Sequence, residues 1–411
     1  MLCHLVAVGW AAASVPVRIE TIDGGNVRGT YAGITAGGRL RVVSDGATGE
    51  LGLDEVRSVV FDTDVTMPGP AAAQALFHLR PRGLLAGRIL DSVEGGIRVE
   101  TVAAGELVLR FEHLAGVRFP QAGARPEARD ALERELSAPQ PGKDVLVALA
   151  AGGVRTVRGR IASLGPAGGR FVYHDRERPF PLEKAAGIVF AAGGGTDTPA
   201  PATVHLVSGA VLPARLLPSG ETNVRVETAF AARLELPPGR ILGIDRLSDR
   251  LVFLSDLLHR EDVRQNVEGL LHDPWPVRAD RSAGNRTISI DGRTFQKGLG
   301  VHARTELVFP LAGSFERFCT TIGIDDAVRP RGHVVFRIVG DDRPLFDSGP
   351  VTGTDPPRDV SIQVSGVNQL TLLVDYGDQM DLADHANWAD ARLIRPAASP
   401  QAARTREEPS R

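Results

Sequence analysis

The stretch KGLGVHART, residues 297–305, is the segment around which the C-terminal third of this 411-residue chain is organised. Its glycines, Gly298 and Gly300, can adopt backbone angles that a side chain would forbid, so the chain can turn sharply there and let other backbone approach. The alternating pattern ELVFPL at 306–311 follows and predicts a strand. His302 therefore lies where the chain enters a sheet. Intermediate burial is usual for histidine, so a half-buried structural role and a binding role have about equal weight.

Short alternating segments continue from this stretch to residue 394, with turn residues between them. The turns are marked by IDG at 290–292, GDD at 340–342 and SGV at 365–367. Strands spaced in this way suit a β-sandwich or jelly roll. The expected strands are 287–290, 306–311, 316–324, 332–339, 343–347, 358–364, 369–375 and 389–394.

Upstream of the sandwich, the sequence repeats itself in four units of about 45 residues. Each unit ends in a short apolar tag, and its second strand carries Gly29, Gly87 or Gly159, with Ala214 in the fourth unit. Glycine inside a strand marks a bend, which lets a small sheet curl. We therefore expect four- or five-stranded barrels or meanders, which resemble SH3-like and Sm-like barrels in outline. Units of this size have marginal cores, so we also expect them to pair through their edge strands.

The predicted fold class is all-β, with tandem small barrels or meanders followed by a β-sandwich. The charged stretch PEARDALERELS has helical spacing and predicts one short helix at 126–137. Pro- and Gly-containing linkers are expected at 66–75 and 191–201. The predicted segments are 1–16 (signal segment), 17–62, 76–119, 144–190 and 203–249 (β-repeats 1 to 4), 120–143 (linker with the helix), 250–396 (sandwich) and 397–411 (disordered tail).

Charge and cysteine content exclude several classes of protein. With 47 basic and 50 acidic residues and no dense Lys/Arg patch, the chain is not expected to bind nucleic acid. Its two cysteines, Cys3 and Cys319, are too few for a disulfide framework or a Cys-rich metal site, and Cys319 reads as a single buried thiol.

The N-terminal residues MLCHLVAVGWAAAS resemble a secretory signal, although they lack its positively charged start. We therefore expect an extracytoplasmic protein: periplasmic, at the cell surface or secreted. No other stretch is apolar for long enough to span a bilayer.

The C-terminal block resembles the NPCBM/NEW2 family of carbohydrate-binding modules, which has a galactose-binding-like jelly-roll fold. The matching segments occur in family order and are FLSDL (253–257), IDGRTFQKGLGVHART (290–305), FERFCTTIGIDD (315–326), GHVVFRIVGDDRPLFDSG (332–349), VSGVNQLTLLVDYG (364–377) and DHANWADARL (384–393). Thr305 stands where the family often has serine. The resemblance implies recognition of a carbohydrate or glycan outside the cytoplasm, often beside a glycoside hydrolase domain. No catalytic domain of that kind is recognisable in this chain.

A sugar site needs a few polar groups for the hydroxyls and an apolar or aromatic platform for the C–H face. DHANWAD (384–390) supplies such groups within seven residues. Trp388 is the first candidate for stacking, but a tryptophan in an alternating pattern usually points into the core, and that alternative is slightly favoured. Trp275, between two prolines, is expected on a loop, either exposed or packing the domain entry. The candidate carbohydrate-binding residues are His302, Asp325, Asp384, His385, Trp388, Asp390 and Trp275.

The paired acids Asp325 and Asp326 follow a strand end, where carboxylates usually accept hydrogen bonds from turn amides. Contact between them and His302 would make His302 structural, whereas a place beside Asp384 or Trp388 in an open groove would make it part of the site. Galactose-binding-like domains often hold a structural calcium ion. Asp381, Asp384 and Asp390, with loop carbonyls, could supply oxygen ligands for calcium, but their spacing is not that of an EF-hand. We assign no metal ligand and no cofactor.

The sequence favours a non-catalytic carbohydrate-binding protein whose repeats act as spacer or interaction modules. The first alternative is a structural or scaffold protein of the cell envelope that binds other proteins. A glycoside hydrolase is less favoured, because it needs two carboxyl groups flanking the sugar, and only Asp325 with Asp384 or Asp390 could provide them. The chain also lacks the GxSxG, HExxH, P-loop and GxGxxG motifs in a suitable context.

Overall fold

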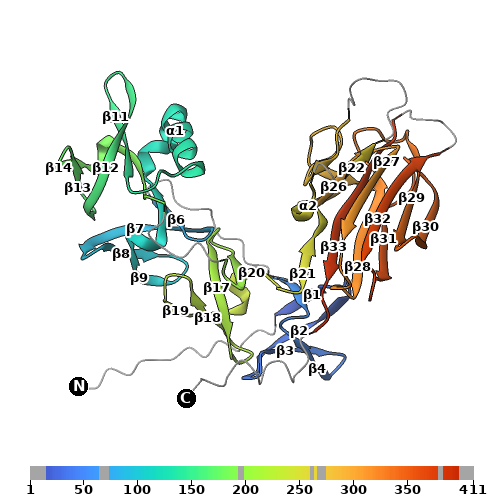
Figure 1. Cartoon of the computed structure of the whole chain (residues 1–411). Helices are drawn as coiled ribbons and strands as arrows, with labels where there is room; N and C mark the ends of the chain where they lie inside the picture. The colour runs from blue at the N-terminus through green and yellow to red at the C-terminus, as the bar shows by residue number, and fades with distance from the viewer. Residues whose placement is uncertain are drawn as a thin grey trace, which may run out of the picture. The chain divides into compact units, whose positions relative to one another are not determined.

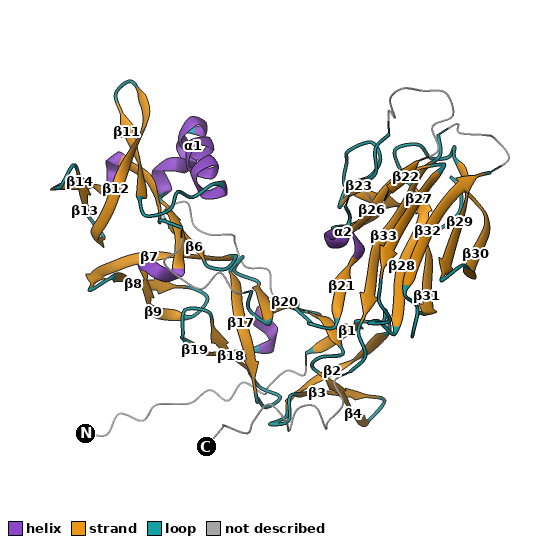
Figure 2. Cartoon of the chain, viewed as in Figure 1, coloured by secondary structure: helices purple, strands orange, loops and turns teal. Residues whose placement is uncertain are grey.

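The computed structural model describes residues 15–63, 74–192, 199–259, 263–265, 275–377 and 383–397. Strands dominate them, which confirms the predicted all-β class (Figures 1 and 2). The chain forms two compact units, unit 1 (Met1–Thr21 and Asn26–Leu247) and unit 2 (Ile22–Gly25 and Ser248–Arg411). Most of the expected signal segment, the linker at 66–75 and the tail lies outside the described residues. None of the described helices is both long enough and apolar enough to cross a membrane.

Each repeat of unit 1 contains five strands. Repeat 1 has β1 (Pro16–Thr21), β2 (Asn26–Ile34), β3 (Arg39–Ser44), β4 (Ala47–Gly52) and β5 (Val56–Phe61). Repeat 2 has β6 (Ala75–Leu79), β7 (Gly83–Val93), β8 (Gly96–Thr101), β9 (Gly105–Arg110) and β10 (Leu114–Arg118). Repeat 3 has β11 (Asp144–Ala150), β12 (Gly153–Gly165), β13 (Gly168–Tyr173), β14 (Arg176–Pro181) and β15 (Ala185–Val189). Repeat 4 has β16 (Ala202–Leu206), β17 (Val211–Leu217), β18 (Val224–Thr228), β19 (Arg233–Leu236) and β20 (Ile241–Arg246).

The first strand of every repeat pairs antiparallel with both the second and the fifth strand, so each small sheet curls back on itself. The glycine in the second strand permits this curl. A Cβ atom on Gly29 would lie 2.5 Å from Val43 O, and one on Gly87 would lie 2.6 Å from Glu100 O. The third strand can therefore approach the second only because no side chain stands there.

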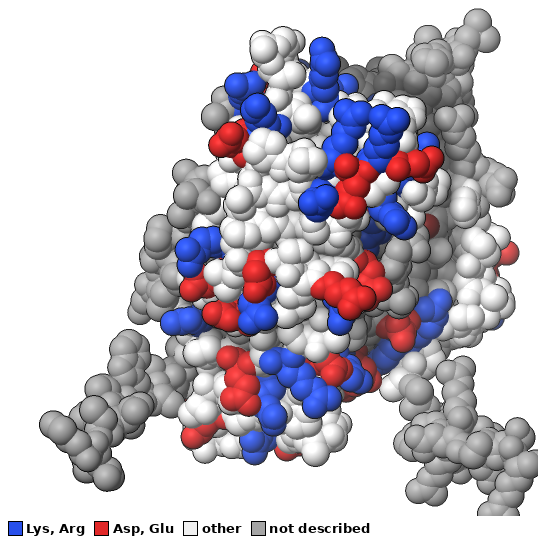
Figure 3. Space-filling view, turned by 90° about the vertical axis from the view of Figure 1, so that its left-hand side faces the viewer, with Lys and Arg blue, Asp and Glu red and all other residues white. Residues whose placement is uncertain are grey.

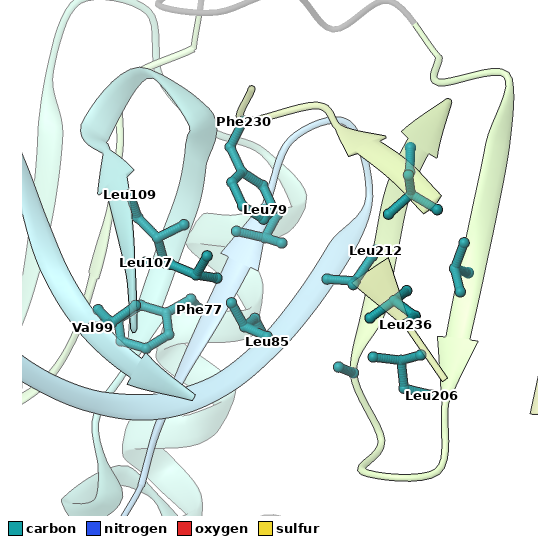
Figure 4. Packing of buried hydrophobic residues seen from close by; sticks show 14 of the residues in the cluster. Phe77, Leu79, Leu85, Val99, Leu107, Leu109, Leu206, Leu212, Phe230 and Leu236 are labelled. Atoms are coloured by element: carbon teal, nitrogen blue, oxygen red, sulfur yellow. The ribbon is translucent and has the colours of Figure 1, made fainter. Parts of the chain in front are cut away.

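The repeats pair through their last strands. Strand β5 of repeat 1 pairs with β20 of repeat 4, with Val59 opposite Ile244, and β10 of repeat 2 pairs with β15 of repeat 3. Repeats 2 and 4 also meet, and Figure 4 shows Phe77 and Leu85 of repeat 2 beside Leu212 of repeat 4. One hydrophobic core therefore runs through all four repeats, as the marginal core of a single repeat predicts.

Helix α1 (Pro126–Ser137) occupies the segment where the sequence predicts a helix, and it covers the junction between β10 and β15. A Cβ atom on Gly187 of β15 would lie 2.8 Å from the Leu132 side chain, so glycine lets the helix pack closely. The corresponding face of β5 and β20 carries polar groups such as Ser58 and Asp245, and Val60 there is 40% exposed. Polar composition explains why that second face is stable without a helix.

The surface of unit 1 carries both signs of charge. Cross-strand ion pairs join Arg88 to Glu100 (2.8 Å) and Arg39 to Glu50 (3.0 Å). Figure 3 shows basic and acidic side chains intermixed on one face of the molecule. Such exposed pairs contribute little to stability, about 0–1 kcal/mol each.

Unit 2 is a sandwich of two antiparallel sheets whose inner faces form one core. Its elements are β21 (Leu251–Phe253), α2 (Leu254–Leu257), β22 (Val263–Gln265), β23 (Arg278–Ala279), β24 (Ile288–Ile290), β25 (Arg293–Phe295), β26 (Gly298–His302), β27 (Thr305–Pro310), β28 (Arg317–Ile324), β29 (His333–Gly340), β30 (Arg343–Thr352), β31 (Arg358–Gln363), β32 (Gln369–Tyr376) and β33 (His385–Ile394). One sheet has the order β23-β26-β33-β28-β31, with β21 also on β33; the other has the order β22-β27-β32-β29-β30.

The stretch 297–305 is itself largely a strand, β26, which lies between β23 and β33. Its glycines allow neighbouring backbone to come close: a Cβ atom on Gly298 would lie 2.7 Å from Trp388 O. Lys297 holds the start of β26, because its Nζ atom lies 2.6 Å from Asp256 Oδ1 and 2.7 Å from Asp280 Oδ2. The segment that the sequence suggested as a turn into the sheet is therefore part of the sheet.

Cys319 is buried in unit 2, 3% exposed and without a disulfide partner, as predicted. Burial raises the pKa of its thiol above the ordinary value, so the reactive thiolate is disfavoured.

Candidate functional site

Trp388 is not a stacking platform. Strand β33 begins at His385, four residues earlier than expected, and directs the Trp388 side chain into the core, where it is fully buried. Its ring packs edge-to-face against Phe336, with centroids 4.9 Å apart and planes at 88°. The favoured alternative, a core tryptophan, is therefore correct, because a sugar ring cannot reach a side chain with no exposed surface.

Asp325 and Asp326 stabilise loops. Asp325, 2% exposed, accepts a hydrogen bond from Asn387 Nδ2 at 2.8 Å. Asp326 accepts from the backbone amides of Asp291 at 2.7 Å and Gly292 at 3.0 Å, which closes the turn between β24 and β25. Both carboxylates therefore follow the commoner pattern that the sequence suggested, and the expectation that Asp325 binds sugar is not supported by its burial.

Asp384 and Asp390 also have structural surroundings. Asp384 is fully buried, and its Oδ1 atom accepts from the backbone amide of His333 at 2.9 Å. Asp390 pairs with Arg392, with 2.6 Å between Oδ2 and the guanidinium, and its side chain is 13% exposed. Asp384 has no exposed surface and Asp390 has little, and the sugar-binding role suggested for each stays a prediction. The acids suggested for glycoside hydrolysis, Asp325 with Asp384 or Asp390, are therefore buried or nearly buried.

The remaining three candidates come together at one end of the sandwich. His302 ends β26 and His385 begins β33, and the two residues stand opposite each other in the antiparallel pair. Their ring centroids are 5.3 Å apart, with planes at 75°. The ring of Trp275 lies 4.4 Å from that of His385 and 6.2 Å from that of His302. We call these residues the Trp-His-His cluster.

The members of the Trp-His-His cluster differ in exposure. Trp275 is 37% exposed, His302 is half-buried and His385 is 8% exposed. Burial lowers the pKa of His385, and a charge on His302 would lower it further, whereas the carboxylate of Asp325 acts in the opposite direction. His385 is therefore neutral at neutral pH. The Trp-His-His cluster therefore offers a partly exposed indole beside the neutral imidazole of His385.

His302 is half-buried and hydrogen-bonded to backbone, which is one of the two roles that the sequence suggested. Its Nδ1 atom donates to the carbonyl oxygen of Ala303 at 2.7 Å, and its ring lies beside His385 and Trp275. The sequence does not reveal which carbonyl accepts this hydrogen bond, because a main-chain acceptor leaves no signal in the residue types. The partnership of the two histidines depends on the register between β26 and β33, which the sequence does not reveal.

No group of three or more His, Cys, Asp or Glu residues with the geometry of a metal site occurs within the described parts of the chain. The segment 378–382, which includes one of the acids suggested for calcium, lies outside those parts. A structural calcium ion therefore stays a prediction.

Comparison with known proteins identifies a family for this part of the chain. Residues 251–394 match the model of the NPCBM/NEW2 domain. The Alpha-1,3-galactosidase B of Akkermansia muciniphila is 32% identical over 118 residues, which are 28% of this chain and 15% of that protein. A protein of Renibacterium salmoninarum is 26% identical over 125 residues, 29% of this chain and 8% of its own length. The chain thus spans only a small part of these curated relatives.

Solved structures include similar chains from Clostridium perfringens. The CBM51 from GH95, in complex with methyl-galactose, is 28% identical, with a TM-score of 0.32, and the match covers 35% of this chain and 99% of that one. The CBM51-2 and INT domains of ZmpB, in complex with GlcNAc, are 24% identical, with a TM-score of 0.32, and the match covers 42% of this chain and 36% of that one. On the family match, residues 251–394 of this chain are an NPCBM/NEW2 domain.

Proposed function

We propose that unit 2 binds carbohydrate at the Trp-His-His cluster. The observation that carries this proposal is an indole, 37% exposed, whose ring lies 4.4 Å from a nearly buried histidine. A pyranose ring has an apolar C–H face that can lie on Trp275 and hydroxyl groups that can bond to His302 and His385. A flat apolar platform beside a few fixed polar groups is the usual composition of a small-ligand site. The NPCBM/NEW2 match of the same residues supports this function.

The binding is proposed to occur without catalysis. Glycosidases place two carboxyl groups against the scissile bond. The acids near the cluster, Asp325 and Asp384, are buried and hold Asn387 and the His333 amide. If either carboxylate left its hydrogen-bond partner, a buried polar group would lose its bond and the fold would lose stability. The two acids are therefore poor candidates for a catalytic acid–base pair.

Export of the protein and the role of unit 1 are also proposed. The leader-like N-terminus favours export, and the carbohydrate ligand is proposed to lie outside the cytoplasm. Unit 1 is proposed to act as a spacer or as a set of interaction modules, including for envelope proteins, because its repeats present several edge strands and loops.

A glycan array probed with the full chain tests the proposal. We expect binding to a subset of glycans, with terminal galactosides as the first probes because one relative is named as a galactosidase. Trp275→Ala should abolish the signal. The matched control is Tyr173→Ala, which removes an aromatic ring of similar exposure, 39%, from unit 1 and should leave binding unchanged. A folded protein that binds no glycan, or a Trp275→Ala variant that binds like the parent, contradicts the proposed site.

A further inference from the structure

The proton on neutral His302 has a definite position. Its Nδ1 atom lies 2.7 Å from the carbonyl oxygen of Ala303, and a carbonyl can only accept, so Nδ1 carries the hydrogen. The other ring nitrogen, Nε2, then carries no hydrogen and has a free lone pair. Neutral His302 therefore offers its surroundings a hydrogen-bond acceptor.

His385 is arranged in the opposite way. It is more than nine-tenths buried, and its Nδ1 atom is buried without a hydrogen-bond partner. A buried N–H group without an acceptor is rarer and less tolerable than a lone pair left without a donor. The neutral ring therefore keeps its hydrogen on Nε2. His385 offers a hydrogen-bond donor beside the acceptor of His302.

We propose that this histidine pair recognises one hydroxyl group of a neutral sugar, which accepts from His385 Nε2–H and donates to His302 Nε2. The inference rests on the proposed function and names the chemical feature that its site reads. The ring centroids of the two histidines are 5.3 Å apart, with planes at 75°, and the ring of Trp275 lies 4.4 Å from that of His385, so the three rings border one small site. A hydroxyl is the simple sugar substituent that donates and accepts at once.

This arrangement discriminates between classes of substituent. A carboxylate only accepts, so it would leave the His302 lone pair facing negative charge. An ammonium group only donates, so it would face the N–H of His385. Each mismatch leaves a desolvated polar group without a partner, which is the usual source of strong discrimination in sugar-sized sites. At the recognised position the pair selects a hydroxyl over an acidic or amino substituent.

The pair works only while both rings are neutral. Two titratable groups act on the charge of His385: His302 on β26 and Asp325, which follows β28. A third, Asp384, directly precedes His385 in the sequence. Protonation turns the His302 acceptor into a donor, so acid removes the hydroxyl's acceptor. Burial, together with the nearby His302, lowers the pKa of His385 and so protects its neutral form.

The first test is a panel of monodeoxy methyl galactosides, with affinities measured by calorimetry on the full chain. Removal of one particular hydroxyl should weaken binding at least about tenfold more than removal of any other, because two hydrogen bonds are lost. In His302→Gln that extra penalty should shrink several-fold, since the variant already lacks one of the two partners of the hydroxyl. The control His205→Gln alters an exposed histidine of unit 1 and should keep the parent's pattern. Equal penalties at all positions, or an unchanged pattern in His302→Gln, overturn the inference.

The second test measures the affinity of the unmodified protein for methyl galactoside between pH 5 and pH 8. It needs no variant, so it does not depend on whether a variant folds. Affinity should be constant near pH 8 and should fall by up to about tenfold per pH unit once a histidine becomes protonated. Circular dichroism at each pH verifies the fold. A flat profile overturns the histidine-pair inference alone. Absence of binding to any galactoside or array glycan at every pH overturns the proposed function and this inference together.

Discussion

The two tryptophans of unit 2 should respond to truncation in opposite ways. Trp388→Ala removes a fully buried indole that packs edge-to-face on Phe336. Replacing a buried aromatic side chain by alanine costs about 3–5 kcal/mol, because the transfer free energy is lost and a cavity remains. In a domain of this size 1 kcal/mol corresponds to about 2–4 °C, so the midpoint of unit 2 should fall by about 6–20 °C.

Trp275→Ala should barely change that midpoint. Its indole is 37% exposed and borders the cluster rather than the core, so we expect a loss of stability within about 1 kcal/mol. Truncating a tryptophan that anchors a ligand costs about 2 kcal/mol or more of binding free energy, which weakens affinity at least about 30-fold. Stability and binding should therefore be lost in different variants.

Differential scanning calorimetry of the full chain measures both midpoints, and titration with the best array ligand measures affinity. A Trp388→Ala protein with the parent's midpoint would refute the buried placement of that indole. An equal fall in midpoint for Trp275→Ala would show that this residue, too, is structural, and the reasoning about the platform would fail.

Three further outcomes follow from particular contacts. Gly159→Ala places a Cβ against the backbone oxygen of Val172, so the free energy of unfolding should fall by about 1–3 kcal/mol in urea titrations, and no change would show that the strands can separate freely. Burial opposes ionisation of Asp280, but the hydrogen bonds that its carboxylate accepts from Lys297 and from the Gly298 amide, with the other hydrogen bonds and the charge of Lys297, together outweigh burial, so the pKa of Asp280 lies below its ordinary value of 3.8. Because this stabilisation is present above pH 3.8 and is lost as the pH falls through the lower folded-state pKa, Lys297→Met should lower the melting midpoint at pH 7, with a difference that disappears in strong acid. Cys319 should react with a thiol reagent at pH 8 about a hundredfold more slowly in the native protein than in denaturant, as read by peptide mapping, and equal rates would contradict its burial.

Much of the architecture could be predicted because it depends on local patterns. Alternating apolar residues predicted the strands of the sheets, and the repeated glycine at positions such as Gly29 and Gly87 predicted that each small sheet curls. The helix at 126–137 follows from its own periodicity. Each of these signals lies within one short segment, so no long-range contact is needed to read it.

The site was harder to predict because it depends on register and burial. The polar residues of DHANWAD (384–390) were candidates for the site, but strand pairing with β26 places Trp388 in the core and His385 at the end of the sheet. Acids in such a motif have equal chemical capacity to bind a sugar or to hold loop amides. Only the fold shows that Asp325 and Asp384 hold structural partners, whereas Trp275 provides accessible surface.

The pairing of repeats through their last strands has a consequence for how the chain folds. Repeats 2 and 3 join through β10 and β15. The other pair joins β5, which precedes both of these strands in the sequence, to β20, which follows them. Closing the outer pair involves a much longer chain segment, and contacts between distant residues form late in folding. We therefore expect a nested order, with the inner pair formed first and the outer pair last. A chain that lost repeat 1 would leave β20 as an unprotected sheet edge, which is a recognised starting point for aggregation.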